Sequence, residues 1–176
     1  MEWETSESVI PEGETLHAAL NLVHVASAVV WAGGAIFIAL FVSRAAQAAG
    51  PAAGPFMGAM LTRTRLVNVM LWAPLLTVAS GAWMWGRNFG TGMPGGWRGI
   101  ALLIGALAGI SALGLGLFRQ RPTILSMRDV VVEMAGNPPS EEQAATVGAL
   151  RAKMTKYGNV LGGLVALAVA GMALGA

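Results

Sequence analysis

Four long stretches of the chain are hydrophobic and contain no Asp, Glu, Lys or Arg. They cover residues 16–43, 66–86, 99–118 and 157–176, and they are 28, 21, 20 and 20 residues long. About 20 apolar residues, at a rise of 1.5 Å each, cross the hydrocarbon core of a bilayer. None of the stretches shows the polar face that a helix of a water-soluble bundle needs. The pattern predicts an all-α fold, an integral membrane four-helix bundle surrounded by the lipid bilayer.

The charges between these stretches predict an orientation. Nine of the eleven Lys and Arg residues lie in segments 44–65 and 119–156, whereas only Arg87 and Arg98 lie between the second and third spans. By the positive-inside rule, the first and third connecting segments face the cytoplasm and both termini lie outside. We therefore expect a multi-pass protein of the inner (cytoplasmic) membrane.

The segment before the first span is acidic. Residues 1–15 contain five Glu and no basic residue, so they lack the basic region that begins a cleavable signal peptide. We expect them to form an external N-terminal segment of the mature chain, followed by one membrane domain over residues 16–176.

Two connecting segments carry helix signals. The loop over residues 119–156 reads as two cytoplasmic helices, the first beginning near Pro122 and the second at Ser140, with Gln143 completing a capping box. The second should continue unbroken into the fourth span. Residues 45–54 read as a short helix extension followed by a turn, because Gly-Pro pairs interrupt them.

The composition excludes several classes of function. The chain is 55% hydrophobic and 11% charged, against roughly 25% charged in a soluble domain. It contains no Cys, which excludes disulfides, thiolate metal sites and a Cys nucleophile. A net charge of +2 does not suggest a nucleic-acid partner. No acid–base pair, nucleophile or phosphate loop occurs in the spans, so nothing in them requires an enzyme; whether the protein is one stays open, and any activity would be a redox role.

Small residues at intervals of three or four positions predict close helix packing within the membrane. The third span carries two such faces and the fourth carries one: Ala101, Gly105 and Gly109; Ala108, Ala112 and Gly116; and Gly158, Gly162, Ala166 and Ala170. We expect these faces to pack within the bundle. The alternatives are a homo-oligomer, or attachment to a larger respiratory or photosynthetic complex.

The first span carries the candidate chemistry. His17, His24 and Trp31 are spaced by seven residues, so they share one stripe of the helix. A polar stripe in a spanning helix is costly when it faces lipid, so this stripe should face the bundle interior. The alternative for His24 is a purely structural imidazole, bonded to a backbone carbonyl, to Thr77 or to Ser80 across the helices.

A haem b site is the first interpretation of this stripe. Two histidines seven residues apart on one straight helix cannot bind opposite faces of one haem iron, so the haem would be bound through His24 alone. Trp31, Gly33 and Gly34 would shape the pocket wall. Arg87 and Arg98 would hold the propionates as charge-assisted partners, or else contact lipid headgroups within an aromatic belt.

Copper is the second interpretation. His17 lies at the depth of Met84 and Met172, near the outer ends of the second and fourth spans, and Met93 lies in the loop between the second and third. Imidazole with thioether ligands suits Cu(I). The alternative is that these methionines are apolar filler.

The motif His24-x6-Trp31-x-Gly33-Gly34 resembles the start of the four-helix core of the copper-resistance protein D (CopD) family and, more distantly, of the HemJ-type protoporphyrinogen oxidases. Further similarity lies in Thr62-Arg63-Thr64-Arg65-Leu66, Ser80-Gly81, Trp97-Arg98 and Arg119-Gln120-Arg121. The resemblance implies a membrane protein that handles haem or copper, with His24 at the position of the family histidine. HemJ-type proteins carry a lysine in the third span, whereas the first lysine of this chain is Lys153.

Three hypotheses follow. The first is a protein that binds one b-type haem through His24, for electron transfer or haem handling. The second is a CopD-like copper-handling protein that uses His17 and the methionines. The third is a cofactor-free accessory subunit of a larger membrane complex.

Overall fold

The structure is a computed structural model that describes residues 12–90, 92, 94–134 and 137–175. Within these residues every regular element is a helix. Four continuous helical segments are long and apolar enough to cross a membrane: Gly13–Ala49, Leu66–Phe89, Gly96–Met134 and Glu141–Gly175. The predicted all-α class and the four candidate spans are confirmed, as a multi-pass membrane protein requires. The external segment predicted over residues 1–15 lies almost entirely outside the described residues.

The first segment is longer than its apolar stretch. It consists of α1 (Glu12–Phe37), the π-helical turn η1 (Ile38–Val42) and α2 (Ser43–Ala49), and it ends at Gly50 with a φ of 56°. A 3-10 turn, η2 (Gly50–Ala52), leads into α3 (Ala53–Thr62). The predicted helix extension is therefore present.

Helix α3 was not predicted, because its Gly and Pro residues indicated a turn. Pro55 lies in the first turn of α3, where a missing N–H removes no helical hydrogen bond. Gly58 is buried, and a Cβ built on it would lie 3.1 Å from Cγ1 of Val131 in α6 (Arg121–Met134). Packing against α6 thus stabilises α3, although the Gly and Pro residues of α3 have a low helix propensity.

The remaining elements follow the prediction more closely. Helix α4 (Leu66–Phe89) is followed by α5 (Gly96–Leu115), which runs through the π-helical turn η3 (Gly116–Gln120) into α6. Helix α7 (Glu141–Gly175) is unbroken, as expected. Its capping box is present, since Ser140 N–H donates to Oε1 of Gln143 at 3.0 Å and Gln143 N–H donates to Oγ of Ser140 at 3.2 Å.

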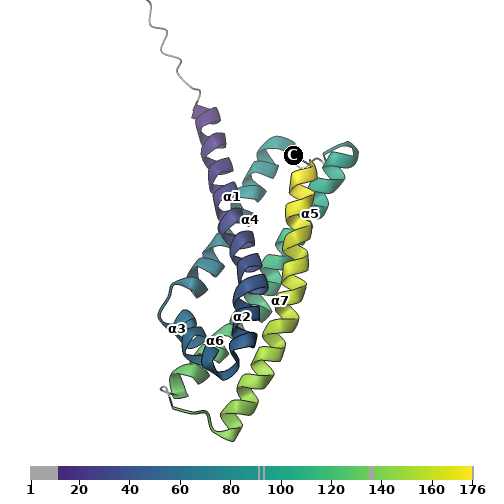
Figure 1. Ribbon diagram of the computed structural model, residues 1–176. Coiled ribbons are helices and arrows are strands. Elements are labelled where there is room, and N and C mark those ends of the chain that lie inside the picture. Colours follow the sequence, from purple (N-terminus) through teal and green to yellow (C-terminus); the bar gives the residue numbers. More distant parts are fainter. Residues whose placement is uncertain (1–11, 91, 93, 135–136, 176) are drawn as a thin grey trace, which may run out of the picture.

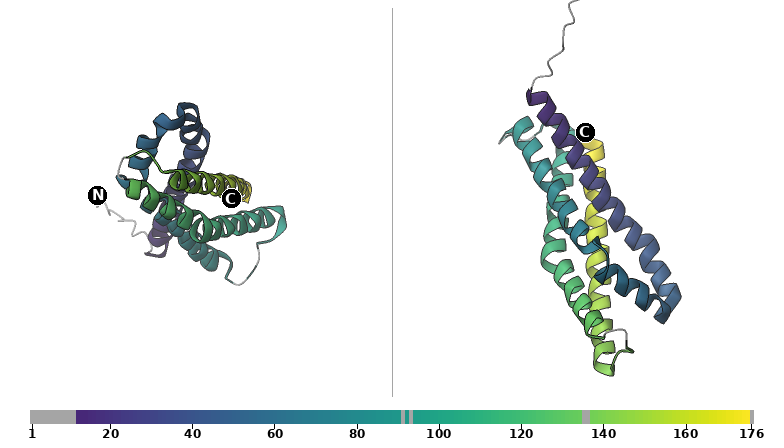
Figure 2. Two further views of the ribbon diagram at one scale, coloured as in Figure 1. Left: turned by 90° about the horizontal axis from the view of Figure 1, so that it is seen from below. Right: turned by 90° about the vertical axis from the view of Figure 1, so that its left-hand side faces the viewer.

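The four long helices form two pairs, α1 with α4 and α5 with α7. α1 begins and α7 ends at the same end of the bundle, here called the terminal end (Figure 1). The pairs meet around Trp31 of α1, Ala73 of α4, Ala112 of α5 and Val165 of α7, all of which are buried. Two further views show α1 crossing the other helices obliquely (Figure 2). This junction is the core of the bundle.

The contact between α5 and α7 depends on glycine. A Cβ built on Gly171 would lie 2.6 Å from the carbonyl oxygen of Ala101 and 2.7 Å from Cα of Gly105. A Cβ built on Gly105 would lie 3.0 Å from the backbone nitrogen of Met172. The backbones of the two helices therefore touch directly. The predicted packing of the third-span face that carries Ala101, Gly105 and Gly109 is confirmed.

The face of the fourth span that makes this contact is a different one. It carries Gly171 and Gly175, whereas Gly158 and Gly162 have open space at their Cβ positions and Ala166 and Ala170 are exposed. The prediction that Gly158, Gly162, Ala166 and Ala170 pack within the bundle was wrong for these four residues. Small residues lie on both faces of α7, so spacing alone did not single out the packed one.

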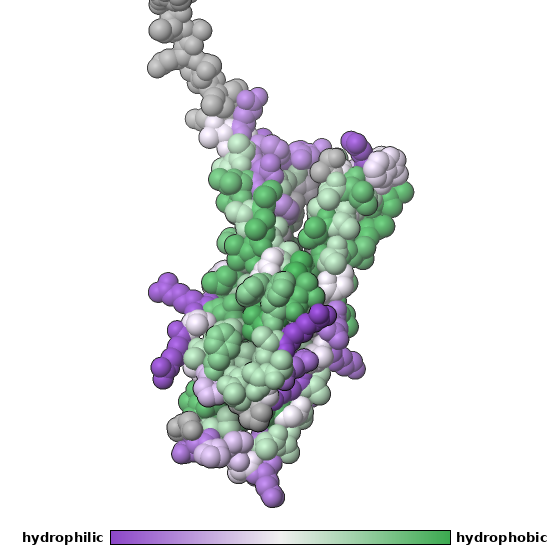
Figure 3. Space-filling model, viewed as in Figure 1, coloured by the Kyte–Doolittle hydropathy of each residue, from purple (hydrophilic) through white to green (hydrophobic). Residues whose placement is uncertain are grey.

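Surface hydropathy follows the length of the bundle (Figure 3). Polar side chains gather at the terminal end and over the half that contains the interhelical loops, and apolar surface predominates between them. At 35 residues, α7 is about 52 Å long, whereas the hydrocarbon core is about 30 Å thick. The loop end of α7 thus extends well beyond the length that a bilayer can cover.

Candidate cofactor site

A cluster of polar side chains lies between α1 and α4. Ser27 of α1 and Thr77 and Ser80 of α4 are 6–8% exposed. Thr77 Oγ1 lies 2.9 Å from Ser27 Oγ, and each hydroxyl also lies within hydrogen-bonding distance of a backbone carbonyl of its own helix. Polar groups inside a membrane must be satisfied by the protein itself. This cluster meets that condition and joins the two helices.

His24 joins the cluster through one ring nitrogen. Its Nδ1 lies 2.8 Å from the carbonyl oxygen of Thr77 and 3.3 Å from Oγ of Ser80. Because a carbonyl oxygen only accepts, Nδ1 carries the proton, and in a neutral imidazole the lone pair is then on Nε2. This is the hydrogen bond that the structural alternative for His24 expects. It is also the arrangement that metal-binding histidines usually have, with the second nitrogen held by a carbonyl.

Gly81 holds the imidazole from the other side. A Cβ built on Gly81 would lie 2.9 Å from Cε1 and 3.2 Å from Nδ1 of His24. Any larger residue would displace the ring from its hydrogen bond. In the sequence, Gly81 stood out only as part of the dipeptide Ser80-Gly81, which did not indicate a contact with His24. The one feature that could have indicated this contact was the position of Gly81 one helical turn after Thr77.

The stripe of α1 that carries His24 contacts α4 at His24 and reaches the other helix pair at Trp31. Trp31 lies seven residues further along the same stripe and is 7% exposed at the junction with Ala112 of α5 and Val165 of α7. Toward the terminal end the two pairs diverge, and a notch separates α1 from α5 and α7 in the space-filling view (Figure 3). His24 is partly buried, and Trp31 lies toward the loop end of the same stripe.

The two glycines expected beside this site have other surroundings. A Cβ built on Gly34 would lie 2.5 Å from Cε of Met70, so the methionine side chain of α4 occupies that space. Gly33 is exposed and has nothing within 4 Å of its Cβ position. Gly34 thus serves the packing of α1 on α4.

Arg87 and Arg98 are both exposed at the terminal end, on α4 and α5. Nη2 of Arg87 would lie 3.7 Å from a Cβ on Gly13 of α1. Cζ of Arg98 lies 5.7 Å from the ring centroid of Trp97. The ion pair that the structure gives within its described side chains is Arg128–Asp129.

The residues of the copper hypothesis lie on three helices. His17 is exposed on α1, and Met84 of α4 and Met172 of α7 are partly buried. Met93 lies outside the described residues. Among the side chains that the structure describes, no three His, Cys, Asp or Glu residues form a group that could hold a metal ion. Copper binding stays a prediction.

Comparison of the chain with family models, with curated proteins and with solved structures finds no match. The resemblance to the CopD and HemJ-type families therefore stays a prediction too.

Proposed function

We propose that this protein binds one b-type haem through Nε2 of His24 and serves electron transfer or haem handling in the membrane. The observation that carries the proposal is the hydrogen bond from His24 Nδ1 to the Thr77 carbonyl. It determines the tautomer, orients the ring and makes Nε2 the more basic ligand. A spanning helix seldom contains an ionisable residue without a functional reason.

The surroundings of His24 fit such a group. Gly81 leaves the imidazole room that a Cβ would take. Trp31 fills the junction of the two helix pairs, seven residues further along the same stripe of α1. A haem bound there would supply one-electron redox chemistry.

The chain's own part in this function is to bind, orient and exclude water. His24 would provide the axial ligand, and the Ser27–Thr77 contact would hold α1 and α4 together at that level. Arg98 is the better candidate for the propionates, because α5 belongs to the helix pair across the notch. We also propose that the protein lies in the inner membrane with both termini outside, as its basic loops indicate.

The test is a pair of visible spectra, oxidised and reduced, of the protein purified in mild detergent after expression with sufficient haem. We expect a Soret band that is lost in His24→Ala and weakened in Gly81→Ala. Gly86→Ala is the matched control, because it lies on the same helix with nothing within 4 Å of its Cβ position. Circular dichroism checks that each variant is folded.

The outcomes separate the three hypotheses. A Soret band unchanged in His24→Ala contradicts the proposal, as does a folded protein that never takes up haem. Stoichiometric copper without a Soret band would instead support the site of His17, Met84 and Met172. Neither cofactor, with a larger complex co-purifying, would support an accessory subunit.

A further inference from the structure

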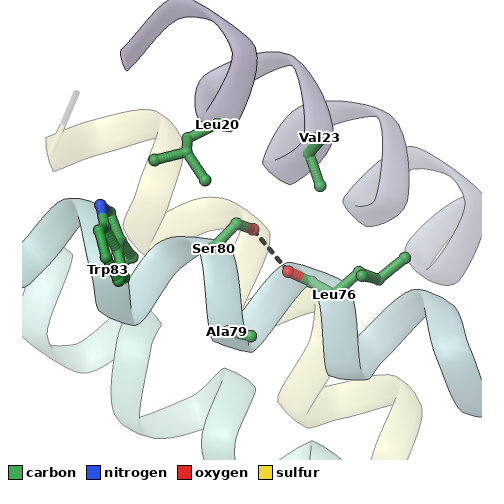
Figure 4. A pocket seen from close by; sticks show the side chains of 6 residues that line it. All are labelled: Leu20, Val23, Leu76, Ala79, Ser80 and Trp83. Atoms are coloured by element: carbon green, nitrogen blue, oxygen red, sulfur yellow. Dashed lines mark hydrogen bonds between the residues drawn. The ribbon is translucent and has the colours of Figure 1, made fainter. Parts of the chain in front are cut away.

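An apolar groove runs along the outside of the α1–α4 contact, in the half nearer the terminal end (Figure 4). It has a volume of about 270 Å³ and is lined by Leu20, Val23, Leu76, Ala79, Ser80 and Trp83. The Ser80 hydroxyl donates to the Leu76 carbonyl, so the groove offers few unsatisfied polar groups.

The groove adjoins the His24 cluster at Ser80. The imidazole packs on Gly81, and its Nδ1 also lies 3.3 Å from Oγ of Ser80, which lines the groove. His24 itself is not among the lining residues. Val23, Leu76 and Trp83 line the groove and are 42–57% exposed to the surroundings of the bundle.

The terminal end of the groove carries a positive charge. Arg87 lies one turn beyond Trp83 on the same stripe of α4, and its guanidinium lies next to Gly13 of α1, so it is above the same contact between the helices. Helix α4 has 24 residues and is about 36 Å long, close to the thickness of the hydrocarbon core. Its last turn, with Arg87, therefore lies at headgroup depth if α4 spans the membrane.

We propose that this groove binds an anionic phospholipid, with one acyl chain along the apolar walls and the phosphate on Arg87. The order along the surface matches the order of groups in such a lipid. Apolar side chains come first, then the indole N–H donor of Trp83, then a guanidinium that binds phosphate oxygens in a bidentate manner.

The preference for an anionic headgroup must come from the positive charge of Arg87. An acyl chain in the groove leaves one hydrocarbon environment for another, so it gains little from the hydrophobic effect. One basic side chain near a membrane surface contributes on the order of 1 kcal/mol toward an anionic lipid, which corresponds to about a fivefold preference. The shape of the groove then decides whether an acyl chain is bound, and the charge of Arg87 decides which headgroup is bound.

The experiment is native mass spectrometry of the full chain released from nanodiscs of phosphatidylcholine that contain a minor fraction of phosphatidylglycerol. We expect one retained phosphatidylglycerol, enriched about fivefold over its share of the bilayer. Arg87→Gln should abolish the enrichment, whereas Arg98→Gln, which removes the same charge at the same end but from α5, should keep it. Ala79→Leu should fill the groove and release the lipid, and Ala82→Leu, exposed on the same helix outside the groove, should not.

Each result decides the proposal. Equal retention of both lipids contradicts the role of Arg87, and enrichment that survives both Arg87→Gln and Ala79→Leu contradicts the site altogether. The absence of any retained lipid also overturns it. Because the readout is lipid mass and not a haem spectrum, the result is independent of the proposed function at His24.

Discussion

Replacing Gly171 with Ala tests the close contact between α5 and α7. The added Cβ would lie 2.6 Å from the carbonyl oxygen of Ala101, which is 0.8 Å short of the 3.4 Å at which ordinary van der Waals contact begins. The obstructing atoms are backbone, so no side chain can move aside, and the helices must separate by most of that distance. A gap of 0.5–1 Å removes a quarter to a half of each dispersion contact along the shared surface. We expect a loss of about 1–3 kcal/mol in the free energy of unfolding, as for other overpacked sites.

The assay is unfolding of the detergent-solubilised protein by sodium dodecyl sulfate, followed by tryptophan fluorescence. Gly163→Ala is the matched control, because Gly163 lies on the same helix and has nothing within 4 Å of its Cβ position. Both variants gain the helix propensity of alanine, about 0.5–1 kcal/mol, so the difference between them isolates the packing contribution. Equal stability of Gly171→Ala and Gly163→Ala would refute the direct backbone contact.

Two further substitutions test other parts of the fold. Trp31→Ala should remove the side chain at the junction of all four helices and lower the free energy of unfolding by about 3–5 kcal/mol. The control is Trp72→Ala, because Trp72 is exposed. Equal losses of the two variants in the same unfolding assay would show that Trp31 is not the centre of the core. Ser140→Ala should remove half of the capping box, at a cost of about 1 kcal/mol. Hydrogen exchange should then quicken only in the first turn of α7, and unchanged protection there would show that the cap contributes nothing.

Local features of the chain were predictable from the sequence. The four spans follow from the length of apolar sequence, since the rise per residue and the bilayer thickness set a minimum. The capping box at Ser140 and Gln143 needs only two residues three positions apart, and the structure contains both of its hydrogen bonds. The sequence also named Thr77 and Ser80 as partners of a structural His24, and the ring is bonded to the Thr77 carbonyl.

Contacts between helices were decided only by the tertiary structure. The sequence singled out His24 but not the role of Gly81, because the need for glycine there arises from an imidazole of another helix. It named the wrong small-residue face of α7, and it missed α3, which is stabilised by contact with α6.

The physical reason is the same in each of these cases. Helices that are apolar all round have no polar face to mark which side is buried, so the choice of partner depends on how closely two backbones approach. The amino-acid sequence determined the number of spans, their lengths and the stripe that carries His24. Only the folded bundle decided that α5 packs on Gly171 of α7, that the imidazole lies on Gly81, and that Arg87 lies beside Gly13 of α1.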